Sequence, residues 1–247
     1  MPVELADGLW WIPQCEPVGD DDDRHVHASV YLLTGAGGNV LVDAGPPDAA
    51  HVREAVEDVT DGAGVDALVM THTNLPHAGD VGAYEDARVY SATDIPPEFG
   101  GYGELWKIDE THDVCGREIS FVKPPMTDHV YSQWPFDHDT GTLFTSEALG
   151  NYHRPGRCTE VWDAPERAVA TEDVDAYCRD RLPWLQYARP ESFRETLERR
   201  LGRFDVDRVA PSHGTPVTAA HLPAYVERLL TVTAGIADDW PLHRAEL

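Results

Sequence analysis

Short apolar runs separated by turn residues occupy the first part of the chain. The segments "WWIP" (10–13), "ASVYLLT" (28–34) and "NVLVDAG" (39–45) have the length and composition of β-strands. The glycine cluster "GAGG" joins the last two of them. It lies between two strands and does not open a helix, so it predicts a hairpin turn and not a phosphate-binding loop.

The hydrophobic period then changes from that of a strand to that of a helix. In the segment 47–60, four apolar residues stand at positions i, i+3, i+4 and i+7, which predicts an amphipathic helix with one face on a core. These residues are Val52, Ala55, Val56 and Val59. The segment 65–72 follows as a short strand buried on both faces. Strand, helix and strand in this order predict a βαβ unit, and we expect a new helix to start near His77.

The middle of the chain favours strands, at 117–123 and 138–147. Two stretches rich in Pro, Gly and aromatic residues, 93–104 and 148–170, predict ordered long loops, which are unusual unless they build a site.

From residue 171 the pattern becomes mainly helical. The segment 191–201 carries a predicted capping box, Ser192 with Glu195. A short strand is expected at 207–211, and the segment 219–230 predicts a helix with one apolar face.

Length and composition predict one domain, 1–247, of the α/β class, because no break in composition divides the chain. A window of about 18 apolar residues, as a membrane span would need, does not occur. The N-terminus "MPVELADGLWWIP" lacks the basic and apolar regions of a signal peptide. We therefore expect a cytoplasmic protein without a membrane partner.

The charge is strongly acidic, with 44 acidic against 19 basic residues and a formal net charge of -25. Such a surface repels nucleic acid and anionic membranes, so neither is an expected partner. The carboxylates would also repel one another at low ionic strength but be screened at molar salt. A salt-loving source explains this excess, and an ordinary acidic cytosolic protein is the alternative.

Four cysteines are spread along the chain without a C-x-x-C pair: Cys15, Cys115, Cys158 and Cys178. Their spacing predicts neither a zinc ribbon nor a disulfide framework. Buried or idle thiols are the expectation.

Candidate metal ligands follow the predicted strands. His72 and His77 come after "ALVMT", His129 lies in "MTDHVY", Glu147 ends "LFTSE", and His213 follows "VAPS". Loops at one edge of the sheets of an α/β sandwich converge, so these side chains can share one site. Imidazoles with a carboxylate form the ligand set of zinc or iron. Taken singly, each histidine would more often be a hydrogen-bonded core residue.

This order of elements and residues resembles the metallo-β-lactamase fold superfamily, a four-layer αββα sandwich. "VLVDAG" carries Asp43, "HTNLPH" takes the place of the H-x-H-x-D-H loop, "LFTSEALG" that of the strand with a bridging Asp, and "PSHG" that of the last ligand. Within the superfamily, "LFTSEALGNY", "YCRDRLPW" and "VAPSHGTPV" are most similar to the diiron domain of flavodiiron proteins and oxygen-binding diiron sensors. The flavodoxin-like domain that carries FMN in flavodiiron proteins has no room in this chain.

The metal loop departs from the family pattern at two positions. Asn74 stands where a His or Glu ligand is expected, and Pro76 where the Asp is expected. Neutral Asn is a poor ligand and Pro has no ligand atom in its side chain. We therefore do not expect an intact two-metal hydrolase.

The remaining ligand set still accommodates one or two ions of iron or zinc. The resemblance implies that one position keeps His72 and His129 and the other keeps His77 and His213, with Glu147 serving either or both. A single ion that uses some of these five residues is the alternative.

Further residues are expected around the site. The resemblance implies that Asp43 orients a ligand histidine, although it also suits a plain turn before Gly45. Asp80 and Asp128 are candidates to add negative charge. His25 and His27 either line the mouth of the site or belong to a solvated acidic loop. The other histidines are expected at the surface: His51, His112, His138, His153, His221 and His243.

Three functions remain open. The flavodiiron resemblance implies non-haem iron that meets or senses dioxygen or nitric oxide, with electrons from a separate flavin or rubredoxin-like partner. A metal-dependent hydrolase of an ester, thioester or phosphoester is the second hypothesis. A non-catalytic binding module with a decayed metal site is the third. A small-molecule ligand or substrate is expected in each case, and a homodimer is compatible with all three.

Overall fold

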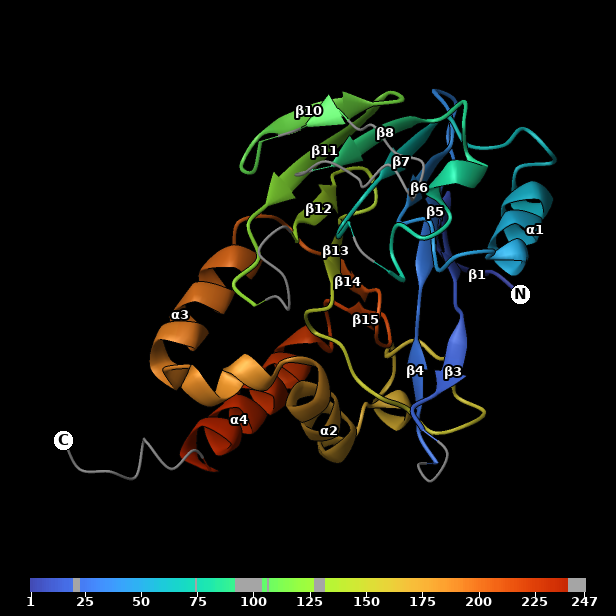
Figure 1. Cartoon of the computed structure of the whole chain (residues 1–247). Coiled ribbons are helices and arrows are strands. Elements are labelled where there is room, and N and C mark those ends of the chain that lie inside the picture. The colour runs from blue at the N-terminus through green and yellow to red at the C-terminus, as the bar shows by residue number, and fades with distance from the viewer. Residues whose placement is uncertain (20–22, 74, 92–103, 106, 127–131, 240–247) are drawn as a thin grey trace.

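Two facing β-sheets with helices on their outer faces make up the computed structural model (Figure 1). It describes residues 1–19, 23–73, 75–91, 104–105, 107–126 and 132–239. The first sheet has the order β1 (Val3–Ala6), β2 (Leu9–Ile12), β5 (Val30–Leu33), β6 (Val40–Val42), β7 (Ala67–Val69), β8 (Arg88–Ser91) and β9 (Glu104–Leu105). The second has the order β10 (Thr111–Val114), β11 (Arg117–Val122), β12 (Trp134–Asp137), β13 (Thr142–Ser146), β14 (Arg208–Pro211) and β15 (Val217–Thr218).

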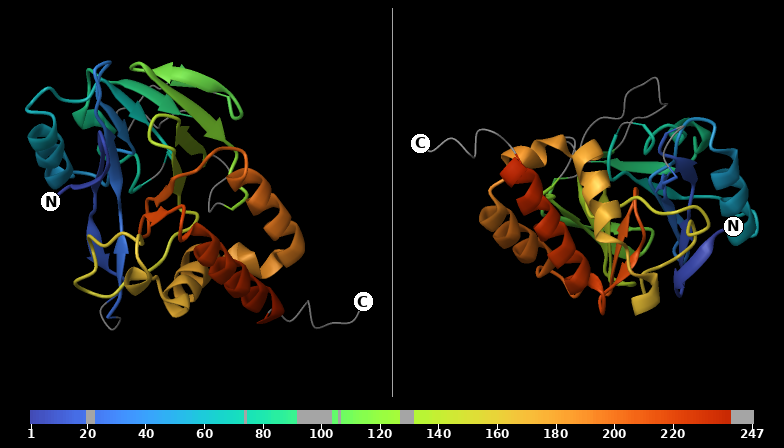
Figure 2. Two further views of the ribbon diagram at one scale, coloured as in Figure 1. Left: turned by 180° about the vertical axis from the view of Figure 1, so that it is seen from behind. Right: turned by 90° about the horizontal axis from the view of Figure 1, so that it is seen from below.

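Helices cover each sheet on the side away from the other sheet (Figure 2). α1 (Ala50–Val59) lies on the first sheet, and α2 (Thr171–Arg181), α3 (Pro190–Leu201) and α4 (Leu222–Asp239) lie on the second. Short 3-10 turns occur at Val81–Ala83, Pro165–Arg167 and Pro183–Tyr187. A separate hairpin, β3 (Cys15–Pro17) with β4 (His25–His27), lies below the sheets in Figure 1.

Three apolar layers hold these elements together. Val52 and Val56 of α1 pack on the outer face of the first sheet. Trp11 and Tyr31 meet Phe144 between the sheets. Tyr177 and Leu229 belong to the layer between the second sheet and its helices. The predicted αββα sandwich is therefore confirmed.

The strands that precede the candidate ligands pair in parallel, so their ends lie at a common edge of each sheet. β6, β7 and β8 run parallel in the first sheet, and β13 and β14 run parallel in the second. The residues that follow β6, β7, β13 and β14 therefore leave their sheets on the same side. Four of the five candidate ligands, His72, His77, Glu147 and His213, belong to these segments.

The strand pattern predicted the hairpin correctly and missed other features. Leu33 pairs with Val40 across the glycine turn, as expected. The tight fit explains a glycine there, because a Cβ at Gly37 would lie 2.1 Å from the Cys115 carbonyl oxygen. The helix expected near His77 is wrong: turns and the 3-10 segment Val81–Ala83 follow this residue.

The predicted capping box is also wrong. α3 begins at Pro190, with Arg189 as its N-cap and without a side-chain capping hydrogen bond. Ser192 and Glu195 therefore lie inside the helix. Proline suits the first helical turn because it lacks the backbone N–H that would be unsatisfied there.

The expectations for two of the cysteines and for one histidine are wrong. Cys15 and Cys158 are joined as a disulfide between β3 and the loop after β13, whereas Cys115 and Cys178 are free. His153, expected at the surface, is buried beside them. Spacing along the chain did not reveal this cluster because its members come from distant segments.

No helix in the described ranges is both long and apolar enough to cross a membrane. Surface arginines pair with carboxylates, as Arg194 does with Glu227 at 2.6 Å. With 44 acidic against 19 basic residues, the formal net charge of -25 is an excess of negative charge that the basic residues cannot neutralise.

Salt should therefore stabilise the protein. We expect the thermal unfolding midpoint to rise by about 10 °C between low and molar KCl. For a domain of this size, such a rise corresponds to an increase of about 3 kcal/mol in the free energy of unfolding. Thermal scans monitored by circular dichroism would measure it. Chloride is used because sulfate also strengthens apolar burial. A midpoint that stays constant or falls would contradict the effect of carboxylate repulsion.

Candidate metal centre

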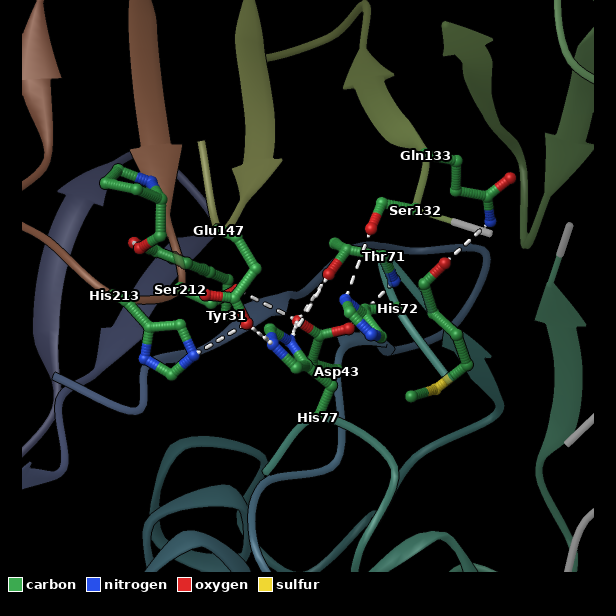
Figure 3. A network of polar contacts seen from close by, with 12 residues as sticks. Tyr31, Asp43, Thr71, His72, His77, Ser132, Gln133, Glu147, Ser212 and His213 are labelled. Carbon is green, nitrogen blue, oxygen red and sulfur yellow. Dashed lines mark hydrogen bonds and ion pairs between the residues drawn. The ribbon is translucent and has the colours of Figure 1, made fainter. Parts of the chain in front are cut away.

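Glu147 lies at the centre of a buried polar cluster where β13 ends (Figure 3). Ser146 before it has a φ of 53°, so the chain leaves the strand in a conformation that few side chains adopt. The carboxylate atom Oε1 lies 2.9 Å from His77 Nε2 and 3.0 Å from His213 Nε2. One buried oxygen thus faces two imidazole rings.

Asp43 fixes the orientation of the His77 ring. Its Oδ2 lies 2.7 Å from His77 Nδ1, so the opposite ring nitrogen, Nε2, is aimed at Glu147. The Asp43 carboxylate also accepts hydrogen bonds from the Thr71 amide and hydroxyl and from Ser212 Oγ. Asp43 itself has a φ of 62° at the end of β6. Its role as an anchor for a candidate ligand follows from these contacts.

A backbone carbonyl orients His213 in the same way. His213 Nδ1 donates a hydrogen bond to the carbonyl oxygen of His27, at the end of β4. Its Nε2 consequently faces the Glu147 carboxylate.

The contacts of His77 are compatible with two charge states. Without a cation, His77 carries a proton on both nitrogens: burial opposes this charge, but the carboxylates of Asp43 and Glu147 outweigh burial and raise the pKa of His77 to about 10. Burial raises the pKa of Glu147, but His213 and His77 outweigh it and hold this pKa well below its usual range.

In the second state a cation replaces protons. With both rings neutral and protonated on Nδ1, the Nε2 lone pairs of His77 and His213 and the Oε1 of Glu147 converge. Three converging electron pairs are the arrangement that a divalent cation requires. The residues present therefore fit a metal ion.

His72 lies on the other side of His77. The two rings stack with centroids 4.9 Å apart and planes 6° apart. His72 Nδ1 lies 3.2 Å from Ser132 Oγ, and the neighbouring Gln133 Nε2 donates to the Met70 carbonyl oxygen at 2.6 Å (Figure 3). Ligand atoms of His72, His77 and Glu147 all lie within 4.8 Å of one another.

The side chains of three further residues predicted around the site have their contacts outside this cluster. Asp80 pairs with Arg53. The His25 ring contacts Cys15, and the His27 ring is fully buried against Cys158, so neither ring lines the mouth of this cluster. His129, Asn74 and Asp128 lie outside the described residues.

Tyr177 of α2 is a member of the cluster that sequence reasoning missed. Its hydroxyl donates to the Glu147 carbonyl oxygen at 2.7 Å and lies 3.2 Å from Oε2 of the same residue. Burial and the Glu147 charge raise the pKa of Tyr177 well above its ordinary value, so the hydroxyl remains a donor. A Cβ at Gly150 would lie 2.4 Å from the Tyr177 ring, which explains the glycine there.

Comparison with known proteins gives one family. Residues 24–213 match the sequence model of the metallo-beta-lactamase superfamily. A curated relative, the coenzyme F420H2 oxidase of Methanocaldococcus jannaschii, is 23% identical over 239 residues, which cover 85% of this chain and 56% of the relative.

Solved structures similar to this chain include flavodiiron proteins and a diflavin flavoprotein. A flavo di-iron protein of Thermotoga maritima has a TM-score of 0.75 at 16% identity, over 95% of this chain and 61% of that one. The rubredoxin oxygen:oxidoreductase of Desulfovibrio gigas has a TM-score of 0.73 at 15% identity, over 95% and 62%. A fragment of a diflavin flavoprotein from Nostoc has a TM-score of 0.71 at 16% identity, over 100% and 98%. The chain thus spans less than two thirds of the curated relative and of the first two structures.

Replacing Tyr177 by Phe should weaken metal binding without unfolding the chain. The change removes the hydrogen bonds that hold Glu147, and loss of such an outer partner typically costs about 10- to 100-fold in metal affinity. Competition with a chelator of known affinity measures the change.

Tyr225→Phe is the matched control. This hydroxyl is equally buried and donates to the carbonyl oxygens of Leu149 and Gly150. Equal metal affinities for the two variants would contradict the role assigned to Tyr177.

Proposed function

Because the chain belongs to the metallo-beta-lactamase superfamily, we propose that it binds one iron ion that meets dioxygen or nitric oxide. The supporting observation is the donor set of His72, His77 and Glu147, whose ligand atoms lie within 4.8 Å of one another. Two imidazoles and one carboxylate form the set of non-haem Fe(II) sites with open coordination positions. His213 is a further candidate ligand because its Nε2 contacts the same carboxylate. His129 remains a predicted ligand from the sequence.

One ion suits the chain better than two. Pro76 and Asn74 replace ligands that the superfamily motif provides, and Glu147 is the single carboxylate among the candidate ligands. A second divalent cation would add charge without an anion to balance it. The same losses count against the hydrolase alternative, since Pro76 cannot orient an attacking water.

Burial of the site favours a small ligand. His72 is 1% exposed, His77 2% and Glu147 6%. A diatomic molecule needs little room beside these donors, whereas an ester or phosphoester needs a cleft. The side chains therefore support oxygen or nitric oxide as the ligand.

Each residue has a distinct task in this proposal. Iron, when bound, supplies electron transfer to a small oxidant. Asp43 holds the proton of His77 at Nδ1, so Nε2 keeps its lone pair for the metal ion. Tyr177 holds the Glu147 carboxylate in place. The apolar layers around them exclude bulk water.

Electrons would come from a partner. One structural neighbour is named for rubredoxin and oxygen, and the curated relative for reduced coenzyme F420. We propose a separate flavin or rubredoxin-like protein as the donor for this chain.

Loading with iron tests the function. Protein purified in high salt and loaded anaerobically with Fe(II) should retain about one iron per chain and develop a visible absorption band when nitric oxide or dioxygen is added. His77→Ala should lose both the iron and the band, because it removes a candidate ligand. His51→Ala, at an exposed helical position, should retain both.

Three results would overturn this proposal. Selective retention of zinc with metal-dependent ester or phosphodiester turnover would support the hydrolase. Failure to retain any metal, with stability unchanged by a chelator, would support a binding module. Equal iron content in the His77 and His51 variants would place the metal elsewhere.

A further inference from the structure

A second group of metal-ligating side chains lies apart from the candidate iron site. It consists of Cys15 on β3, His25 on β4, and His153 and Cys158 on the loop after β13. This loop runs beside the β3–β4 hairpin in both Figures 1 and 2. The backbones of His25 and His153 exchange two hydrogen bonds, of 2.7 and 3.0 Å, which fix these residues side by side.

The ring nitrogens converge on the sulfurs. Cys15 Sγ lies 3.0 Å from His25 Nδ1 and 3.1 Å from His153 Nε2. Cys158 Sγ lies 3.4 Å from His153 Nε2 and 3.8 Å from His25 Nδ1. Each imidazole therefore presents one nitrogen to both sulfur atoms.

The sulfur–nitrogen separations are close to those of a tetrahedral zinc site. Zinc bonds of about 2.3 Å to sulfur and about 2.05 Å to nitrogen place the two ligand atoms about 3.6 Å apart at a tetrahedral angle. The four sulfur–nitrogen distances, 3.0, 3.1, 3.4 and 3.8 Å, lie around that value. Two thiolates with two imidazoles at tetrahedral geometry are a common ligand set of structural zinc sites.

We propose that, in the reduced chain, these four side chains form a Cys2His2 zinc site. The structure joins the two sulfurs as a disulfide, and a disulfide alone does not account for two imidazole nitrogens directed at them. Thiol and disulfide sulfurs are weak hydrogen-bond partners, whereas thiolates and imidazoles are strong zinc ligands. The disulfide is thus the competing state of the same cluster.

His27 connects this cluster to the candidate iron site. Its ring stacks on His153 with centroids 4.0 Å apart and donates from Nε2 to the Cys158 carbonyl oxygen. Its own carbonyl oxygen accepts the hydrogen bond from His213 Nδ1. A zinc ion at the cluster would therefore hold β4 in the position that orients His213.

Zinc content and cobalt spectra test the proposal. The 247-residue chain is reduced, loaded with zinc, dialysed and analysed for metal and free thiols. The zinc content of Cys15→Ser and of Cys158→Ser should each be lower than that of the unmodified protein by about one ion per chain. Cys115→Ser, a free and partly exposed thiol outside the cluster, should lose none.

Cobalt gives a readout that needs no variant. Co²⁺ bound to the reduced, unmodified protein should produce a thiolate-to-metal charge-transfer band, which the His and Glu ligands of the other site cannot produce. Four titratable thiols without that band would overturn the proposal. Equal zinc content in Cys15→Ser and Cys115→Ser would also overturn it, as would a cysteine pair that stays oxidised under the reducing conditions.

Discussion

The buried carboxylate of Glu147 is the group on which the rest of the site depends. A carboxylate away from water is costly unless charge and hydrogen bonds compensate it. Its Oε1 faces the Nε2 atoms of His77 and His213 at 2.9 and 3.0 Å. The compensation is either a protonated imidazole or a metal ion, and both use the same atoms.

The fold provides this convergence through its strand order. Asp43 follows β6, Glu147 follows β13 and His213 follows β14, so both sheets contribute at one edge. Asp43 and the His27 carbonyl then orient one ring each. Because both rings are fixed through Nδ1, their Nε2 atoms are already in position to bind a metal ion. Binding therefore costs less conformational entropy.

Much of this arrangement could be predicted from residues at strand ends. His72, His77, Glu147 and His213 each follow an apolar run, and the run marks the strand that carries them. The structure brings these four together. Whether they hold a metal remains a prediction.

Contacts between distant segments could not be predicted in this way. Tyr177 lies on a helix 30 residues after Glu147. It begins the stretch "YCRDRLPW", but nothing in that stretch marks its hydroxyl as a partner of Glu147. Cys15 and Cys158 are 143 residues apart, and they meet because the β3–β4 hairpin pairs with the loop after β13 through His25 and His153. Local patterns also predicted a helix that does not form: the segment around His77 consists of turns, and these turns position its side chain.

The most direct test of the account is anomalous diffraction from crystals of protein loaded with Fe(II), with data collected on both sides of the iron absorption edge. The account predicts one iron peak within bonding distance of Glu147 and His77. In a contradicting result, iron-soaked crystals would show no peak there. The Nε2 of His77 would then remain in direct hydrogen-bond contact with Oε1 of Glu147, and the cluster would be a polar network without a metal.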